Sequence, residues 1–135
     1  MARLKVRSNV WPVDSGDFLF AFFSTVRTRL EPDGWGSRFP VVMNELYGGE
    51  LSGESAPKAV AELDQIREEL RKLPPSKLVW DAEEPSKQPP WGENVRDDVD
   101  DLASAFTTHD GRGLFEIFDE AVGYAARAGA PLHVQ

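Results

Sequence analysis

The strongest constraint on the fold is a stripe of apolar side chains near the middle of the chain. Val60, Leu63, Ile66, Leu70 and Leu73 are separated by three, three, four and three residues. This spacing places them on one side of a helix, and an apolar stripe of that kind has to be buried against other elements. We expect Ser55 to cap this helix and the adjacent prolines at 74–75 to end it.

Shorter patterns on either side predict further helices and strands. Ser15 can cap a helix over residues 16–31, although the alternation of Phe18, Phe20 and Phe22 also fits a strand. Asp110 and Gly129 can begin and end a last helix. Further helices are expected over residues 40–47 and 99–106, and strands over residues 4–7, 77–80 and 132–134. We therefore predict an α+β fold, in which one domain over residues 1–135 packs several helices on a small sheet of roughly three strands.

Several classes of function are excluded or disfavoured by what the sequence lacks. The chain has no cysteine and two histidines, His109 and His133, so thiolate catalysis and zinc sites with Cys or three His ligands are excluded. No phosphate-binding glycine loop, EF-hand spacing or catalytic constellation stands out, so we expect no catalytic residue, metal or cofactor. No apolar run is long enough for a bilayer, and no secretory signal pattern is present, which favours a cytoplasmic protein.

Acidic residues are concentrated in one part of the chain. The net charge is −8, and residues 81–101 hold eight acids against Lys87 and Arg96, whereas residues 1–80 are balanced. This balance disfavours direct binding to nucleic acid and to anionic membranes, because both depend on basic side chains. The segment suits a cationic protein partner, whose approach it can accelerate. The alternative is a solvated acidic surface that keeps the protein soluble.

Three of the four tryptophans lie beside turn signals rather than inside an expected helix or strand. Trp11 precedes a proline, Trp35 lies between two glycines, and Trp91 stands between proline and glycine within the acidic segment. Tryptophans on loops can anchor a protein interface. Alternatively, each ring covers an edge of the core while its indole N–H makes a hydrogen bond. Trp80 lies in an apolar run, as a core tryptophan would.

Several ungapped segments together form a specific pattern: FLFAFFST (18–25), RLEP (29–32), GWGSRFP (34–40), MNELY (43–47), VWD (79–81), PPWG (89–92) and DGR (110–112). These segments resemble the bacterial immunity protein 70 family, and the resemblance extends from about residue 4 to residue 125. Proteins of this family are predicted immunity factors encoded beside polymorphic toxins.

The resemblance implies a protein that is not an enzyme and that neutralises a cognate contact-dependent or secreted toxin domain. It would bind this toxin, for which a nuclease is one candidate, and block its active site or a nearby surface. The resemblance supplies no functional residues. From charge and aromatic character alone, we expect the toxin interface to include Glu83, Glu84, Trp91, Asp97, Asp98, Asp100 and Asp101.

Two other functions remain open at this point. The chain could be an acidic adaptor for a different cationic protein, which its gene neighbourhood would distinguish from an immunity protein. A small enzyme that uses carboxylates from residues 81–110 is the less favoured alternative. In that case a single Asp or Glu substitution would abolish activity while the protein stays folded.

Overall fold

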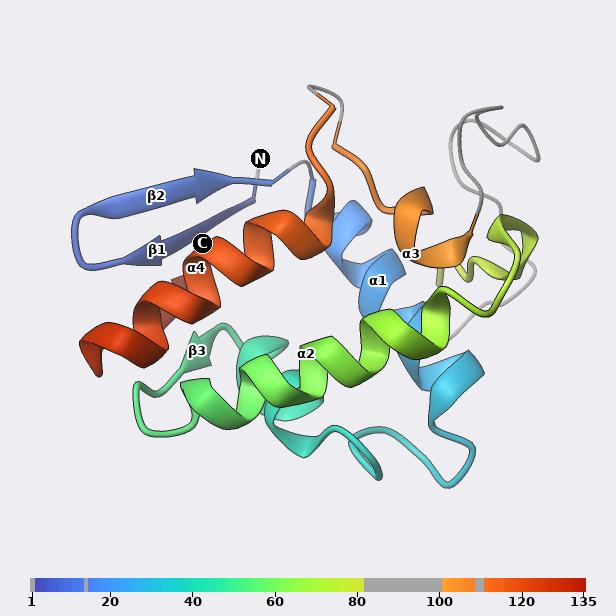
Figure 1. Cartoon of the computed structure of the whole chain (residues 1–135), viewed down its shortest axis with the longest axis horizontal. Coiled ribbons are helices and arrows are strands. Elements are labelled where there is room, and N and C mark those ends of the chain that lie inside the picture. The colour runs from blue at the N-terminus through green and yellow to red at the C-terminus, as the bar shows by residue number, and fades with distance from the viewer. Residues whose placement is uncertain (1, 14, 82–100, 109–110) are drawn as a thin grey trace.

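A computed structural model describes residues 2–13, 15–81, 101–108 and 111–135, and its elements are shown in Figure 1. The helices are α1 (Gly16–Leu30), the π-helix η1 (Val41–Leu46), α2 (Ala56–Leu70), the 3-10 helix η2 (Pro75–Lys77), α3 (Leu102–Ala105) and α4 (Leu114–Ala128). The strands are β1 (Arg3–Val6), β2 (Asn9–Pro12), β3 (Glu50–Leu51) and β4 (Leu132–Val134). The predicted α+β class is confirmed.

The described strands form one antiparallel sheet in the order β2-β1-β4-β3. The first and last strands of the chain, β1 and β4, are neighbours at its centre, with Lys5 opposite His133. Leu4, Val6, Leu51 and Leu132 are fully buried, and they come from three of the strands. One side of the sheet therefore contributes to the core, and α4 lies in contact with β1.

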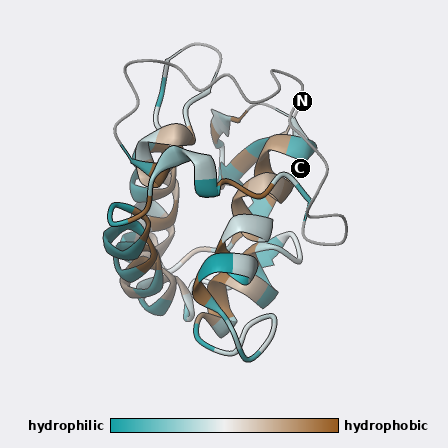
Figure 2. Cartoon of the chain, turned by 90° about the vertical axis from the view of Figure 1, so that its right-hand side faces the viewer, coloured by the Kyte–Doolittle hydropathy of each residue, from teal (hydrophilic) through white to brown (hydrophobic). Residues whose placement is uncertain are grey.

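Phe22 of α1 is the centre of the aromatic core. Its ring centroid lies 5.3 to 5.5 Å from the rings of Phe23, Phe106, Phe115 and Phe118. These residues come from α1, from the end of α3 and from α4, so one ring joins segments that are far apart in the sequence. In Figure 2 the hydrophobic residues of the helices face inward and the hydrophilic residues lie mainly on their outer sides.

The ends of α1 and α4 confirm two predictions from the sequence. Ser15 caps α1, because its Oγ accepts a hydrogen bond from the Phe18 N–H at 3.1 Å. The helical interpretation of this segment is therefore correct, and the alternative strand is wrong. Gly129 ends α4 in the left-handed conformation at φ 62°, where glycine has no Cβ to clash.

Other helix ends differ from prediction. Ser55 precedes α2 but its side chain makes no capping bond; instead its N–H donates to Ser52 Oγ at 3.1 Å. The helix ends at Leu70, so Leu73 lies beyond it. Gly113 occupies the N-cap of α4, and Asp110 lies outside the described residues.

The strand predicted over residues 77–80 is wrong. Pro75–Lys77 is a 3-10 helix, and the chain then runs through the buried residues Val79 and Trp80, neither of which belongs to a strand. A side chain takes the place of a neighbouring strand here. Thr25 Oγ1 accepts a hydrogen bond from the Val79 N–H at 2.9 Å and lies 3.2 Å from the Val79 carbonyl oxygen. The buried backbone is thereby satisfied without a sheet.

The strand β2 was not expected, because its turn lacks the usual signal. Residues 7–8 are Arg-Ser, whereas two-residue hairpins favour Asn-Gly or Asp-Gly. Arg7 has φ 56°, a left-handed conformation that is unfavourable for a long side chain. The pairing of Leu4 with Trp11 and Lys5 with Val10 holds the turn closed despite this conformation.

Two buried carboxylates build the connector between α1 and α2. Glu31 Oε1 accepts the Gly36 N–H at 3.0 Å, while Oε2 accepts the N–H groups of Arg38 and Phe39 at 3.0 and 3.1 Å. Glu62 of α2 accepts the N–H of Val42 at 2.8 Å and so satisfies a donor at the start of η1. These bonds provide the polar partners that a buried carboxylate requires.

We expect Glu31→Gln to lower the free energy of unfolding by about 2–3 kcal/mol, because the new amide group would face backbone donors and leave buried groups unpaired. Urea denaturation at pH 7 measures this change. The exposed neighbour Asp33, changed to Asn, is the control and should differ little from wild type. Equal stability of the Glu31 variant and wild type would contradict the assigned role.

We expect Arg7→Asn to raise the free energy of unfolding by about 1 kcal/mol, since asparagine tolerates the left-handed region better than arginine. The hydrogen bond lost with Arg7, to the Ala128 carbonyl oxygen at 3.4 Å, is long and exposed. The same denaturation experiment applies. Ser8→Asn serves as the control, because no positive φ is found at Ser8, and it should give no such gain.

Candidate protein-binding surface

Of the interface residues predicted from charge, the structure describes Asp101 alone. Its carboxylate caps α3 and accepts the Ser104 N–H at 2.8 Å. This contact assigns Asp101 a structural role at a helix start, where a negative charge is favourable. The other six predicted interface residues lie outside the described residues: Glu83, Glu84, Trp91, Asp97, Asp98 and Asp100.

The tryptophans that the structure describes pack on the core. The Trp35 indole N–H donates to the Met43 carbonyl oxygen at 2.6 Å, and the Trp11 ring lies 6.1 Å from that of Tyr124. Both rings are half-buried against the core, in agreement with the alternative that each tryptophan covers an edge of the core. Trp80 is buried, and Trp91 is outside the described part of the chain.

His133 belongs to one of the two central strands of the sheet. The strand β4 lies inside the sheet, so His133 has Lys5 opposite it on one side and Glu50 on the other. His109 lies outside the described residues. Within residues 2–13, 15–81, 101–108 and 111–135, no group of three or more His, Asp or Glu side chains could hold a metal ion.

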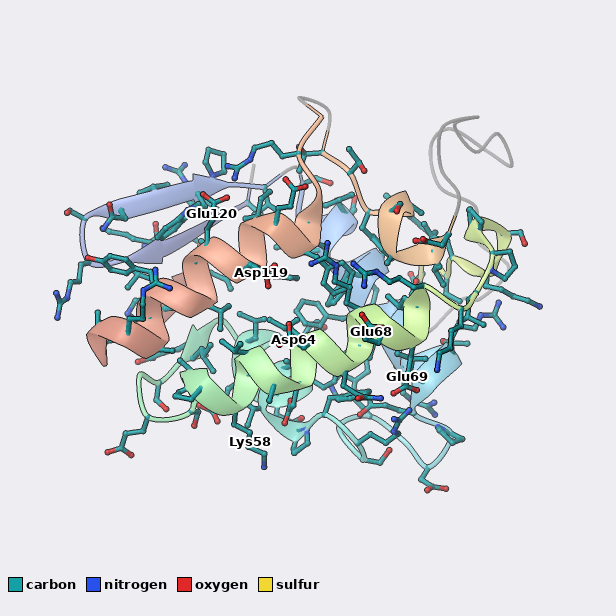
Figure 3. The ribbon with its side chains drawn as sticks, viewed as in Figure 1. Lys58, Asp64, Glu68, Glu69, Asp119 and Glu120 are labelled. Atoms are coloured by element: carbon teal, nitrogen blue, oxygen red, sulfur yellow. The ribbon has the colours of Figure 1, made fainter. Side chains whose placement is uncertain are left out.

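Carboxylates also gather where α2 and α4 lie side by side, a feature that the sequence analysis missed. Figure 3 shows Asp64 and Asp119 projecting from the two helices into the space between them. Arg67 lies 3.4 Å from Asp119, and two further pairs join Arg71 to Glu68 and Arg112 to Glu120. We call the exposed acids of these helices the α2–α4 acidic face: Asp64, Glu68, Glu116, Asp119 and Glu120.

Like charges converge within this face. Partial burial raises the pKa of Asp119, and the negative charges of Asp64 and Glu116 raise it further, whereas Arg67 acts in the opposite direction. The carboxylates are therefore close enough to repel one another, and Arg67 opposes this repulsion at Asp119. A cationic group from a partner would relieve this repulsion. The signal in the sequence was that Asp64 and Glu68 lie off the apolar stripe, but it could not reveal that α4 is their neighbour.

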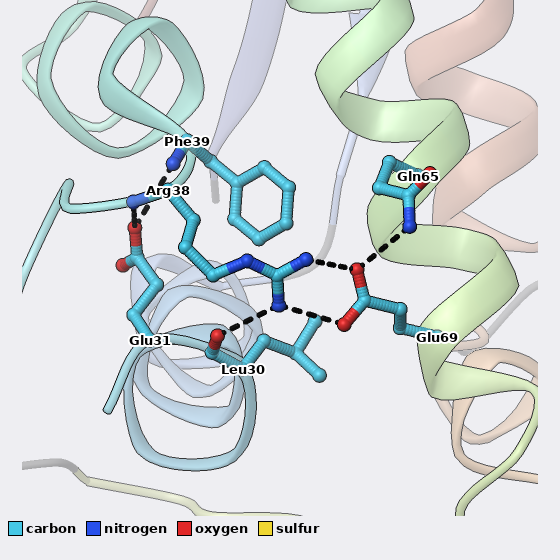
Figure 4. A network of polar contacts seen from close by, with 6 residues as sticks. All are labelled: Leu30, Glu31, Arg38, Phe39, Gln65 and Glu69. Carbon is cyan, nitrogen blue, oxygen red and sulfur yellow. Dashed lines mark hydrogen bonds and ion pairs between the residues drawn. The ribbon is translucent and has the colours of Figure 1, made fainter. Parts of the chain in front are cut away.

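On the opposite side of α2, an arginine fastens the connector to the helix (Figure 4). The guanidinium of Arg38 donates to both oxygens of Glu69, at 2.7 and 2.5 Å, and to the Leu30 carbonyl oxygen at 2.9 Å. Gln65 also donates to Glu69 at 2.9 Å. The hydrogen bond from Arg38 holds the pKa of the Glu69 carboxyl below its usual range. The protein's own fold thus uses this charge pair, so neither partner is a strong candidate for contacting another molecule.

Together, these features describe a class: a small α+β protein whose exposed helices carry carboxylates suited to a protein partner. The model of the immunity protein 70 family matches residues 4–134. The chain therefore belongs to the immunity protein 70 family, as the resemblance indicated. No curated protein and no solved structure matches the chain. No helix in the described part of the chain is long and apolar enough to cross a membrane.

Two carboxylates of this region should respond to pH in opposite directions. The lowered pKa of Glu69 means that its charge stabilises the folded state above about pH 4, and that this contribution is lost as the pH falls through the folded-state pKa. Glu69→Gln should therefore cost about 1 kcal/mol at pH 7, and progressively less as the pH falls through the folded-state pKa. Denaturation at pH 7 and over a series of acidic pH values measures the difference.

Asp119 provides the contrast. Its raised pKa means that the charged form is disfavoured in the folded state, so Asp119→Asn should stabilise the protein at pH 7. This gain should disappear as the pH falls through the raised pKa toward the usual value for aspartate. A loss of stability at pH 7 would show that the ion pair with Arg67 outweighs burial and repulsion.

Proposed function

We propose that this protein neutralises a cognate toxin domain in the cytoplasm, by binding the toxin and blocking its active site or a nearby surface. Membership of the immunity protein 70 family over residues 4–134 is the observation that carries this proposal. The toxin is delivered by contact or secretion in this scheme. The immunity protein acts as a non-enzymatic inhibitor, and its contribution is affinity rather than chemistry.

The negative charge of the chain supports a toxin with a basic surface, such as a nuclease that binds phosphate groups through basic side chains. A protein with net charge −8 attracts such a partner over several ångströms and raises the rate of encounter. The α2–α4 acidic face offers one surface for this attraction. The acidic segment offers the second, and its proposed contact residues are Glu83, Glu84, Trp91, Asp97, Asp98, Asp100 and Asp101.

The direct experiment is to co-express the chain with the toxin domain encoded beside its gene and to measure survival. Rescue, followed by purification of a stable complex, would establish the proposed function. The control is a variant of the protein that folds but does not bind the toxin. Cell death with this variant shows that survival with the wild-type protein does not come from lower expression of the toxin. If the toxin kills equally with and without the protein, the proposal is wrong.

Association kinetics with the purified toxin should then separate the two acidic surfaces. Asp97→Lys tests the acidic segment, and Asp64→Lys tests the α2–α4 acidic face. Each variant should associate about threefold to tenfold more slowly at low salt, with a weaker dependence on salt concentration.

Glu54→Lys is the matched control, because it makes the same charge change at an exposed position before α2. It reports the effect of net charge alone. If Asp97→Lys behaves like Glu54→Lys, the acidic segment is not part of the interface. The same comparison decides the part played by Asp64, and neither result depends on the other.

A further inference from the structure

One patch of the surface is aromatic rather than charged. Tyr47 is 47% exposed, and Val10 is the other large hydrophobic residue exposed in the described part of the chain. The Tyr47 ring lies 4.8 Å from that of Trp35 and 6.3 Å from that of Phe20. These two neighbours are half-buried. We call Phe20, Trp35 and Tyr47 the aromatic platform.

The platform is held rigidly from beneath. Tyr47 packs on the buried ring of Phe23 at 5.1 Å, in an edge-to-face arrangement. Trp35 is fixed by the bond from its indole N–H to the Met43 carbonyl oxygen at 2.6 Å. Rigid aromatic side chains lose little conformational entropy on binding, which is one reason why Trp and Tyr dominate the energetics of protein interfaces.

The backbone below Tyr47 has an uncommon conformation. The Tyr47 N–H donates to the Val42 carbonyl oxygen, five residues earlier, at 3.1 Å, so η1 is wound as a π-helix. π-helical turns are rare in proteins, and those that do occur often lie at functional sites. The carboxylates of Glu31 and Glu62 hold the connector and the start of this helix in place. Buried hydrogen bonds therefore hold the connector and the start of the helix that ends at Tyr47.

The electrostatics of the platform favour a cation. The face of an aromatic ring is electronegative, the chain has a net charge of −8, and Asp17 lies three residues before Phe20 on the same helix, which makes the two side chains neighbours on its surface. Arg27 of α1 donates to the Glu31 carbonyl oxygen and Arg38 of the connector binds Glu69, so both guanidinium groups are already held by the chain itself.

We propose that the aromatic platform receives an arginine or lysine side chain of the toxin domain, stacked on the exposed face of Tyr47. This inference rests on the proposed function and assigns the platform to the toxin interface. The acidic surfaces accelerate encounter, whereas the platform slows dissociation, because a desolvated cation–π contact adds to the lifetime of the complex.

The test is the affinity of Tyr47 variants for the purified toxin domain encoded beside the gene. Tyr47→Phe keeps the ring and should bind within about twofold of wild type. Tyr47→Leu keeps an apolar side chain without a ring and should bind about tenfold more weakly, mainly through faster dissociation. Val10→Ala, at the other exposed apolar residue, is the control and should bind as wild type does.

Thermal unfolding of each variant, with binding measured well below its midpoint, separates folding from recognition. Hydrogen exchange of the wild-type protein with and without toxin is a second readout, and it should show protection over residues 34–48. Wild-type affinity of Tyr47→Leu, or equal weakening of the Phe and Leu variants, overturns the cation–π contact and leaves the proposed function intact. Failure of the wild-type protein to bind the toxin overturns both.

Discussion

The hydrogen bonds of the Glu31 carboxylate determine the conformation of the connector between α1 and α2, which leads to the surface that carries Tyr47. It is completely buried and is bonded to the backbone N–H groups of Gly36, Arg38 and Phe39. A charge in that position is tolerated only because several donors converge on it. The loop that closes around Glu31 also brings Arg38 to Glu69 on α2 and leads into the π-helix. One buried charge thereby sets the path from the end of α1 to the surface that carries Tyr47.

The α2–α4 acidic face and the aromatic platform would affect different steps of the proposed binding. In the proposed complex, long-range attraction comes from carboxylates such as Asp64 and Asp119, whose exposed charges are screened by salt. Asp119 also pairs with Arg67 of the chain itself. Close contact comes from rings that are already packed and oriented, so little entropy is lost when a partner covers them. The first property governs how often partners meet, and the second governs how long they stay together.

Local signals predicted the helices well and the sheet poorly. Ser15 and Gly129 act through hydrogen bonds or backbone conformations within a few residues, so their roles follow from the sequence. The hairpin turn at Arg7 and the backbone of Val79 depend on distant partners, which override local preference. For the candidate site, Asp101 remains a predicted contact residue, and the structure adds that its carboxylate caps α3. The sequence could not reveal this second role, because a helix start and a binding surface favour the same residue type.

The sequence by itself determined the α+β class, the positions of the main helices, the excess of acid and the membership of a family of immunity proteins. These depend on periodicity, composition and ungapped segments, which need no knowledge of distant contacts. Only the tertiary structure decided the strand order, the burial of Glu31 and Glu62, the meeting of Asp64 with Asp119 and the exposure of Tyr47. The reason is physical: burial and proximity are set by which elements pack together, and that packing joins residues far apart in the chain.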